Sequence, residues 1–180
     1  ASMAANPEVI YVPTADGWQL ALHLWPALGQ RRPHPVLMVH GLAANRLNLD
    51  LDEELSIARA AQRHGFDVYL LDLRGAGLSR PPGGKDRNTF QWSFGEYAIY
   101  DMPSAVRTVL EHSRATQIHG FGHSMGGMLL YAFGVSQPPE LRSIVTVGAP
   151  LVAELRLAKR ERRLLDFVTR CNARRSSRVP

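Results

Sequence analysis

One short segment of the chain, residues 120–127 with the sequence GFGHSMGG, holds a serine in the pattern G-x-S-x-G. An apolar stretch precedes the segment and another follows it, which predicts a strand that turns sharply into a helix. Ser124 would stand at the corner, and Gly122 and Gly126 would leave room for the tight turn. A serine hydroxyl in this position is a candidate nucleophile, and it needs a neighbouring base to become reactive.

Backbone N–H groups near this corner are suited to binding a negatively charged oxygen. The helix after Ser124 begins with free N–H groups, of which that of Met125 is the first, and with the positive end of the helix dipole. Another apolar run ends at His40, and the loop after it can bring the N–H of Leu42 beside the corner. We therefore predict an oxyanion hole formed by the Leu42 and Met125 amides. The residues expected next to it are His40, Gly41, Gly122, His123 and Gly126.

Two other interpretations of the glycine-rich segment are open at this point. The glycines at 120, 122 and 126 resemble a dinucleotide-binding turn, but their spacing is one residue longer than that fingerprint. The fingerprint also belongs on the first strand of its unit. Alternatively, the segment is a glycine-rich turn in which the serine has no chemical role. The other motifs of the chain favour the nucleophile.

The elements that would position these residues follow from the pattern of apolar and polar stretches. Residues 9–12 and 18–25 flank the dipeptide Asp16-Gly17, which predicts a β-hairpin. Strands and helices then alternate, which is typical of a mostly parallel sheet of about six strands flanked by helices. The expected strands are 36–39, 66–71, 118–121 and 143–147, and the expected helices are 52–64, 94–112, 125–135 and 153–170.

Two charged residues and a proline lie among these elements. Asp72 and Arg74 follow the strand at 66–71, and we interpret them as structural rather than catalytic, forming an ion pair or a brace for the loop. Pro103 falls inside the helix predicted at 94–112, so we expect a kink or a restart of that helix near Asp101.

Three motifs in this order resemble those of the α/β-hydrolase superfamily: HGLAAN from residue 40, DLRGAGLS from residue 72 and GHSMGG from residue 122. The stretch WSFGEYAIYDMPSAV at 92–106 is similar to one in the acid-lipase branch. The resemblance covers roughly residues 8–150. It implies an α/β-hydrolase-like fold and hydrolysis of carboxylic esters, lipid-like ones first, through an acyl-enzyme on Ser124. It implies no cofactor and no metal. Met125 stands where the branch frequently has glutamine, which affects the shape of the pocket more than the mechanism.

Charge divides the 180 residues into two parts. Residues 1–150, the expected N-terminal part of a hydrolase core, have a net charge of −1, whereas residues 151–180 have +6 and are expected to form a basic helix and a disordered tail. That basic part holds one aromatic residue, Phe167, so we expect no nucleic-acid partner. No apolar run is long enough to span a bilayer. Cys171 is the single cysteine and excludes an internal disulfide, so we expect a cytoplasmic protein.

The catalytic base expected from the resemblance has no matching position in this sequence. In that fold the acid and then the histidine follow the serine along the chain, but the last histidine here is His123. Of the remaining histidines, His40 is expected to lie near the serine. We therefore expect a chain that stops before the triad is complete, with three explanations open. It is a fragment of a serine hydrolase, an inactive binding or interaction protein on the same scaffold, or one part of an enzyme that a partner chain completes.

A shortened sheet would also leave a strand edge without a neighbour. The strand expected at 143–147 would then form that edge, and unpaired strand edges invite self-association. A helix at 153–170 folded over the edge would prevent it.

Overall fold

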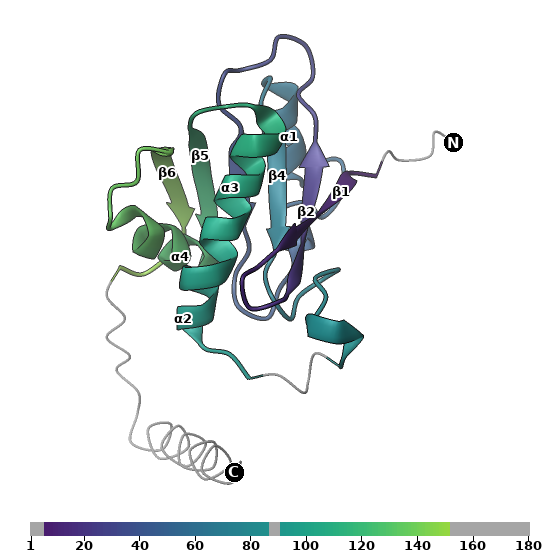
Figure 1. The fold of residues 1–180 in the computed structure, drawn as a ribbon. Coiled ribbons are helices and arrows are strands. Elements are labelled where there is room, and N and C mark those ends of the chain that lie inside the picture. The colour runs from purple at the N-terminus through teal and green to yellow at the C-terminus, as the bar shows by residue number, and fades with distance from the viewer. Residues whose placement is uncertain (1–5, 87–90, 152–180) are drawn as a thin grey trace, which may run out of the picture.

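The computed structural model describes residues 6–86 and 91–151, which fold around one six-stranded sheet (Figure 1). The strands lie in the order β1-β2-β4-β3-β5-β6. β3 pairs in parallel with β4 and β5, and β6 pairs in parallel with β5. β1 and β2 form the antiparallel hairpin that the sequence predicted, and β2 joins this hairpin to the sheet at β4. The strands are Glu8–Pro13 (β1), Gln19–Trp25 (β2), Val36–Val39 (β3), Val68–Asp72 (β4), Ile118–His123 (β5) and Leu141–Val147 (β6).

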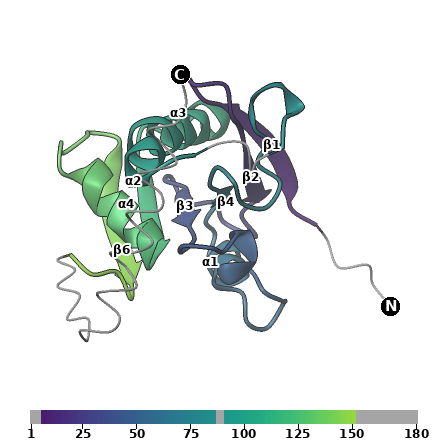
Figure 2. The ribbon, with the colours of Figure 1, turned by 90° about the horizontal axis from the view of Figure 1, so that it is seen from below.

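Helices cover both faces of this sheet (Figure 2). In β3, Val36 and Met38 pack into a cluster with Ala58 of α1, whereas Leu37 and Val39 pack on the other face with residues of α3 and α4. A strand buried on both faces reads as a continuous apolar run, which is why the sequence located β3 well. The helices are α1 (Ile57–Arg63), α3 (Met102–Ser113) and α4 (Met125–Gly134), and short 3-10 turns are η1 (Arg46–Asn48) and η2 (Pro82–Gly84).

The helix predicted at 52–64 is shorter than expected, because α1 begins only at Ile57. Ser56 caps it, and its Oγ accepts the N–H three residues on at 2.9 Å. Upstream, Oδ1 of Asp52 accepts two backbone N–H groups, at 2.9 Å and 2.8 Å. Such a local turn competes with helix formation, so the polar residues before Ser56 stay outside the helix.

The helix predicted at 94–112 contains a π turn at the place where an irregularity was expected. It runs through Phe94–Glu96 (α2), Tyr97–Asp101 (η4, the π turn) and then α3. Pro103 has no N–H, and its ring would crowd the carbonyl four residues earlier in a regular α-helix. The wider π turn just before it accommodates this, so the irregularity near Asp101 is confirmed and its form is a π turn.

A buried arginine joins three distant segments beside this turn. The Arg74 side chain is 2% exposed, and its Nε and Nη2 donate to Oδ1 of Asp101 at 2.9 Å and 2.7 Å. Its Nη1 donates to Oδ2 of Asp16, in the β1–β2 turn, at 2.6 Å. Arg74 is therefore structural, as predicted from the sequence. Its partners are Asp16 and Asp101 rather than Asp72.

In the part of the chain that the structure describes, β6 is the outermost strand on the side of the sheet away from β1. Val145 and Val147 of this strand are 52% and 49% exposed. The expected strand edge at 143–147 is thus present within the described ranges. The helix and tail predicted for residues 153–180 lie outside them. Across residues 6–86 and 91–151, every helix is too short or too polar to cross a membrane.

We predict that Asp101→Asn destabilises the fold far more than Asp16→Asn. Asp101 is 0% exposed, so its loss strands the Arg74 charge in the interior, which costs about 3 kcal/mol or more. The Asp16 side chain is 28% exposed, so water takes over part of its role and the loss is about 1 kcal/mol. Urea unfolding of the two variants measures both values, and equal losses would contradict the difference in burial.

Candidate active site

Ser124 stands between His123, the last residue of β5, and Met125, the first residue of α4. Its backbone angles, φ 51° and ψ −118°, lie outside the regions that residues with a side chain normally adopt. Such a conformation costs on the order of 1–3 kcal/mol and persists only where the surroundings impose it. The Ser124 N–H donates to the carbonyl oxygen of Val147 at 2.9 Å, which ties the corner to β6. The sharp strand-to-helix turn predicted from the sequence is confirmed.

The two glycines of the serine motif are required by close packing. A Cβ on Gly122 would lie 2.5 Å from the backbone nitrogen of Gly127. A Cβ on Gly126 would collide with the carbonyl oxygen of Val39, at the end of β3. The first turn of α4 thus packs against the ends of β5 and β3 at a distance that leaves no room for a side chain.

Gly41 brings the loop after β3 into contact with this corner. A Cβ on Gly41 would lie 3.2 Å from Cβ of Ser124 and 3.2 Å from Nδ1 of His123. Leu42 follows directly and is 71% exposed. Met125 opens α4, so its N–H has no acceptor within the helix. The two predicted oxyanion donors therefore belong to the two segments that meet at Ser124.

His40 is buried and both of its ring nitrogens are in use. The N–H of Leu73 donates to Nε2 of His40 at 3.1 Å, so Nε2 carries a lone pair. Nδ1 lies 2.8 Å from the carbonyl oxygen of Gly41 and therefore carries the proton. Burial lowers the pKa of His40, outweighing the Gly41 carbonyl and the Asp72 charge, which raise it. The ring is neutral and fixes the loop, and it has no free nitrogen to accept the Ser124 proton.

The other histidines do not supply the base either. All seven histidines of the sequence lie within the described ranges, and no hydrogen bond there joins one of their rings to the Ser124 hydroxyl. Four further rings have other partners: His23 with Asp72, His112 with Tyr69, His119 with Ser143 and His123 with Asn48. Within the described ranges, the candidate nucleophile Ser124 therefore has no histidine hydrogen-bonded to it.

Asp72, the last residue of β4, holds the loops at the carboxyl ends of the strands in place. It is 1% exposed, and Oδ2 accepts from Nε2 of His23 at 2.8 Å and from the N–H of Leu78 at 3.0 Å. Oδ1 accepts from the N–H of Arg46 at 2.8 Å. Burial acts to raise the pKa of Asp72, but these hydrogen bonds outweigh it and hold the pKa below its ordinary value. The prediction of a loop brace is confirmed.

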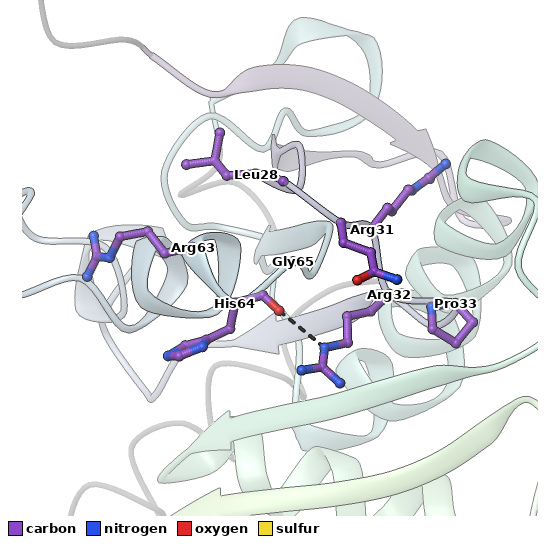
Figure 3. Close-up of a pocket in the computed structure, with 9 residues that line it drawn as sticks. Leu28, Arg31, Arg32, Pro33, Arg63, His64 and Gly65 are labelled. Carbon is purple, nitrogen blue, oxygen red and sulfur yellow. Dashed lines mark hydrogen bonds between the residues drawn. The ribbon is translucent and has the colours of Figure 1, made fainter.

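A cavity of about 530 Å³ lies at the opposite end of the parallel strands, where β3 and β4 begin (Figure 3). Its lining comes from residues 28–33 before β3 and residues 63–65 before β4, whereas Ser124 follows the carboxyl end of β5. Arg31 and Arg63 extend to different sides of the cavity, and Nε of Arg32 donates to the His64 carbonyl oxygen at 3.2 Å. This cavity is separate from the serine.

One residue beside the serine was missed by the sequence analysis. Oδ1 of Asn48 lies 2.8 Å from Nδ1 of His123 and accepts the N–H of Gly41 at 3.3 Å. Nothing in its spacing distinguishes Asn48 from an ordinary loop asparagine. Within the described ranges, no group of three or more His, Cys, Asp or Glu side chains is arranged to hold a metal ion.

Comparison with known proteins identifies the family of this chain. The family model for the alpha/beta hydrolase fold matches residues 34–172. A putative lysosomal acid lipase/cholesteryl ester hydrolase of Crotalus adamanteus is 35% identical over 145 residues, covering 74% of this chain and 36% of that protein. Lipase lipl-3 of Caenorhabditis elegans is 32% identical over 141 residues, covering 70% of this chain and 34% of that protein. The chain spans about a third of the length of these relatives.

Solved structures share the fold. The crystal structure of the alpha/beta hydrolase GrgF from Penicillium sp. sh18 superimposes with a TM-score of 0.70 at 26% identity. The match covers 96% of this chain and 56% of that one. The fold of this chain thus matches part of that longer chain.

We predict that acid weakens the fold partly through Asp72. Because the pKa of Asp72 is lower in the folded than in the unfolded chain, its stabilising contribution is complete above about pH 5 and is lost as the pH falls through the folded pKa. Asp72→Asn should therefore be less stable than wild type near neutral pH and lose less of its remaining stability on acidification. Urea unfolding between about pH 6 and about pH 3 measures both curves. Parallel curves would contradict the prediction.

Proposed function

Because the chain belongs to the α/β-hydrolase fold family, we propose that it acts as a serine hydrolase on carboxylic esters or lipid-like substrates, with Ser124 as the nucleophile. The observation that carries this proposal is the strained corner at Ser124, with φ 51°, held against Gly41 of the loop after β3. Residues held in such strained conformations cluster at functional sites. The lipase names of the relatives support esters as the substrate class.

The proposed reaction begins with attack of Ser124 Oγ on the acyl carbon. The carbonyl oxygen becomes negatively charged and accepts hydrogen bonds from the N–H groups of Leu42 and Met125. Collapse of this intermediate releases the alcohol and leaves the acyl group on Ser124, and water then hydrolyses the acyl-enzyme. The positive end of α4 favours the charge that develops beside its first turn.

A base must take the Ser124 proton and give it to the departing alcohol, and we propose that this base comes from outside these 180 residues. His40 uses both ring nitrogens, and the remaining histidines make no hydrogen bond to Ser124 within the described ranges. The relatives are about three times as long as the matched part of this chain, which leaves room for an acid and a histidine in further sequence. A partner chain is the other source.

A second candidate function follows from the same missing base. A chain with the scaffold and without the proton acceptor would bind an ester or a protein partner without turning it over. The occupied ring nitrogens of His40 favour this alternative for the chain taken alone.

Fluorophosphonate labelling followed by intact-mass measurement separates the two functions. We expect slow labelling of the wild-type chain that is absent in Ser124→Ala and unchanged in Ser136→Ala, an exposed serine away from the corner. Without a base the rate should lie on the order of 10⁴-fold or more below that of a complete triad. It should also keep rising with pH, because no histidine titration limits it.

Two outcomes would contradict this account. A plateau of the labelling rate near neutral pH would show a histidine base inside the chain. Complete absence of labelling in a folded sample would favour the binding protein.

We also propose that the β6 edge is where further polypeptide pairs with this sheet. Val145 is exposed on β6, the last strand on that side among the described residues. In the chain alone, the free edge should cause self-association that depends on concentration. Val145→Lys should shift size-exclusion elution toward the monomer, whereas Ile99→Lys, at an exposed helical position away from the sheet edges, should not. A wild-type monomer at all concentrations would contradict this proposal.

A further inference from the structure

The side chain of Asn48 bridges the two segments that meet at the serine. Asn48 is the last residue of η1, the turn that follows the loop after β3. Its Oδ1 accepts the N–H of Gly41 at 3.3 Å and lies 2.8 Å from Nδ1 of His123, the residue before Ser124. One oxygen atom therefore contacts both the loop that carries Leu42 and the strand end that carries the nucleophile.

The chemistry of these contacts fixes the position of a proton. The Gly41 N–H can only donate, so the Asn48 atom facing it must be the carboxamide oxygen. Because that oxygen can only accept, Nδ1 of His123 must carry a hydrogen. In the neutral ring, Nε2 then holds the lone pair. A Cβ on Gly148 would lie 3.9 Å from Nε2, which places that nitrogen on the side of the loop after β6.

The bridge joins surfaces that already fit closely. A Cβ on Gly41 would lie 3.2 Å from both Nδ1 of His123 and Cβ of Ser124, so a small movement of the loop would change its contact with the serine. The turn that presents Asn48 is itself anchored, because its Arg46 N–H donates to Asp72 at 2.8 Å.

We propose that Asn48 is a positioning residue, whose carboxamide oxygen holds the oxyanion loop against the nucleophile corner and keeps His123 in its Nδ1–H form. The part of this proposal that concerns the oxyanion rests on the proposed hydrolase function. The part that concerns the His123 proton rests on geometry alone and is tested without any activity.

The first experiment measures the tautomer of the neutral His123 ring by ¹⁵N NMR of the whole chain. His123→Gln assigns the signal. We expect the Nδ1–H form in wild type and in Asn48→Asp, which keeps an oxygen acceptor. In Asn48→Ala we expect the ring to shift toward the Nε2–H form, which free histidine prefers in water. A predominantly Nε2–H ring in wild type, or no change in Asn48→Ala, would overturn the proposal.

The matched control is Asn45→Ala. Asn45 caps the same turn, where its Oδ1 accepts the N–H of Leu47 at 2.9 Å, and it makes no recorded hydrogen bond to the corner within the described ranges. The Asn45→Ala substitution removes the same type of side chain as Asn48→Ala and loosens the same turn. The His123 tautomer should stay as in wild type. A change equal to that of Asn48→Ala would mean that the turn as a whole, rather than the Asn48 oxygen, sets the ring, and would overturn the proposal.

The second experiment compares labelling rates of Ser124 with a fluorophosphonate. We expect Asn48→Ala to label roughly threefold to tenfold more slowly than wild type, the factor that corresponds to one ordinary hydrogen bond. Asn48→Asp should retain most of the rate, and so should Asn45→Ala. Equal rates in Asn48→Ala and wild type would overturn the positioning role. If wild type does not label, the hydrolase function fails and the oxyanion part of the proposal fails with it, while the tautomer result decides the role of Asn48 in fixing His123.

Discussion

The arrangement of the loops at the carboxyl ends of the strands depends on the hydrogen bonds of one buried carboxylate, that of Asp72. It is 1% exposed and accepts hydrogen bonds from β2 through His23 and from two loops through the backbone of Arg46 and Leu78. A buried charge is tolerable only when its oxygens are satisfied, so all three donors must arrive together. This requirement couples the hairpin, the loop after β3 and the loop after β4. The position of the loop after β3 is therefore a consequence of folding all three segments together.

The serine corner adds a second constraint, which is steric. Gly122 and Gly126 allow α4 to touch the ends of β5 and β3, and this contact forces Ser124 to a positive φ. The strain at one residue is carried by the packing of three elements. Asp72 sets the loop from one side and the glycine contacts set the corner from the other, so the gap between Gly41 and Ser124 is fixed by two independent causes. Asn48 spans that gap with a single oxygen atom.

The sequence predicted the features that depend on local pattern or on one residue type. The six strands, the hairpin and the turn at Ser124 were found because apolar runs and glycine spacing encode them directly. The start of α1 was missed because a side-chain turn at Asp52 competes with helix over a few residues. The partners of Arg74 could not be found, because Asp16 is 58 positions away along the chain and only the folded sheet brings the two together.

The histidines show why residue type alone could not assign the base. His40 precedes Gly41, the residue that packs against Ser124, yet its ring is neutral and is hydrogen-bonded to the Gly41 carbonyl and the Leu73 N–H. A ring with two structural partners positions a loop and cannot also carry a proton from the serine. The fold of β3, β5 and α4 positions Ser124 and the backbone N–H groups beside it, whereas no histidine ring in the described ranges is hydrogen-bonded to the serine.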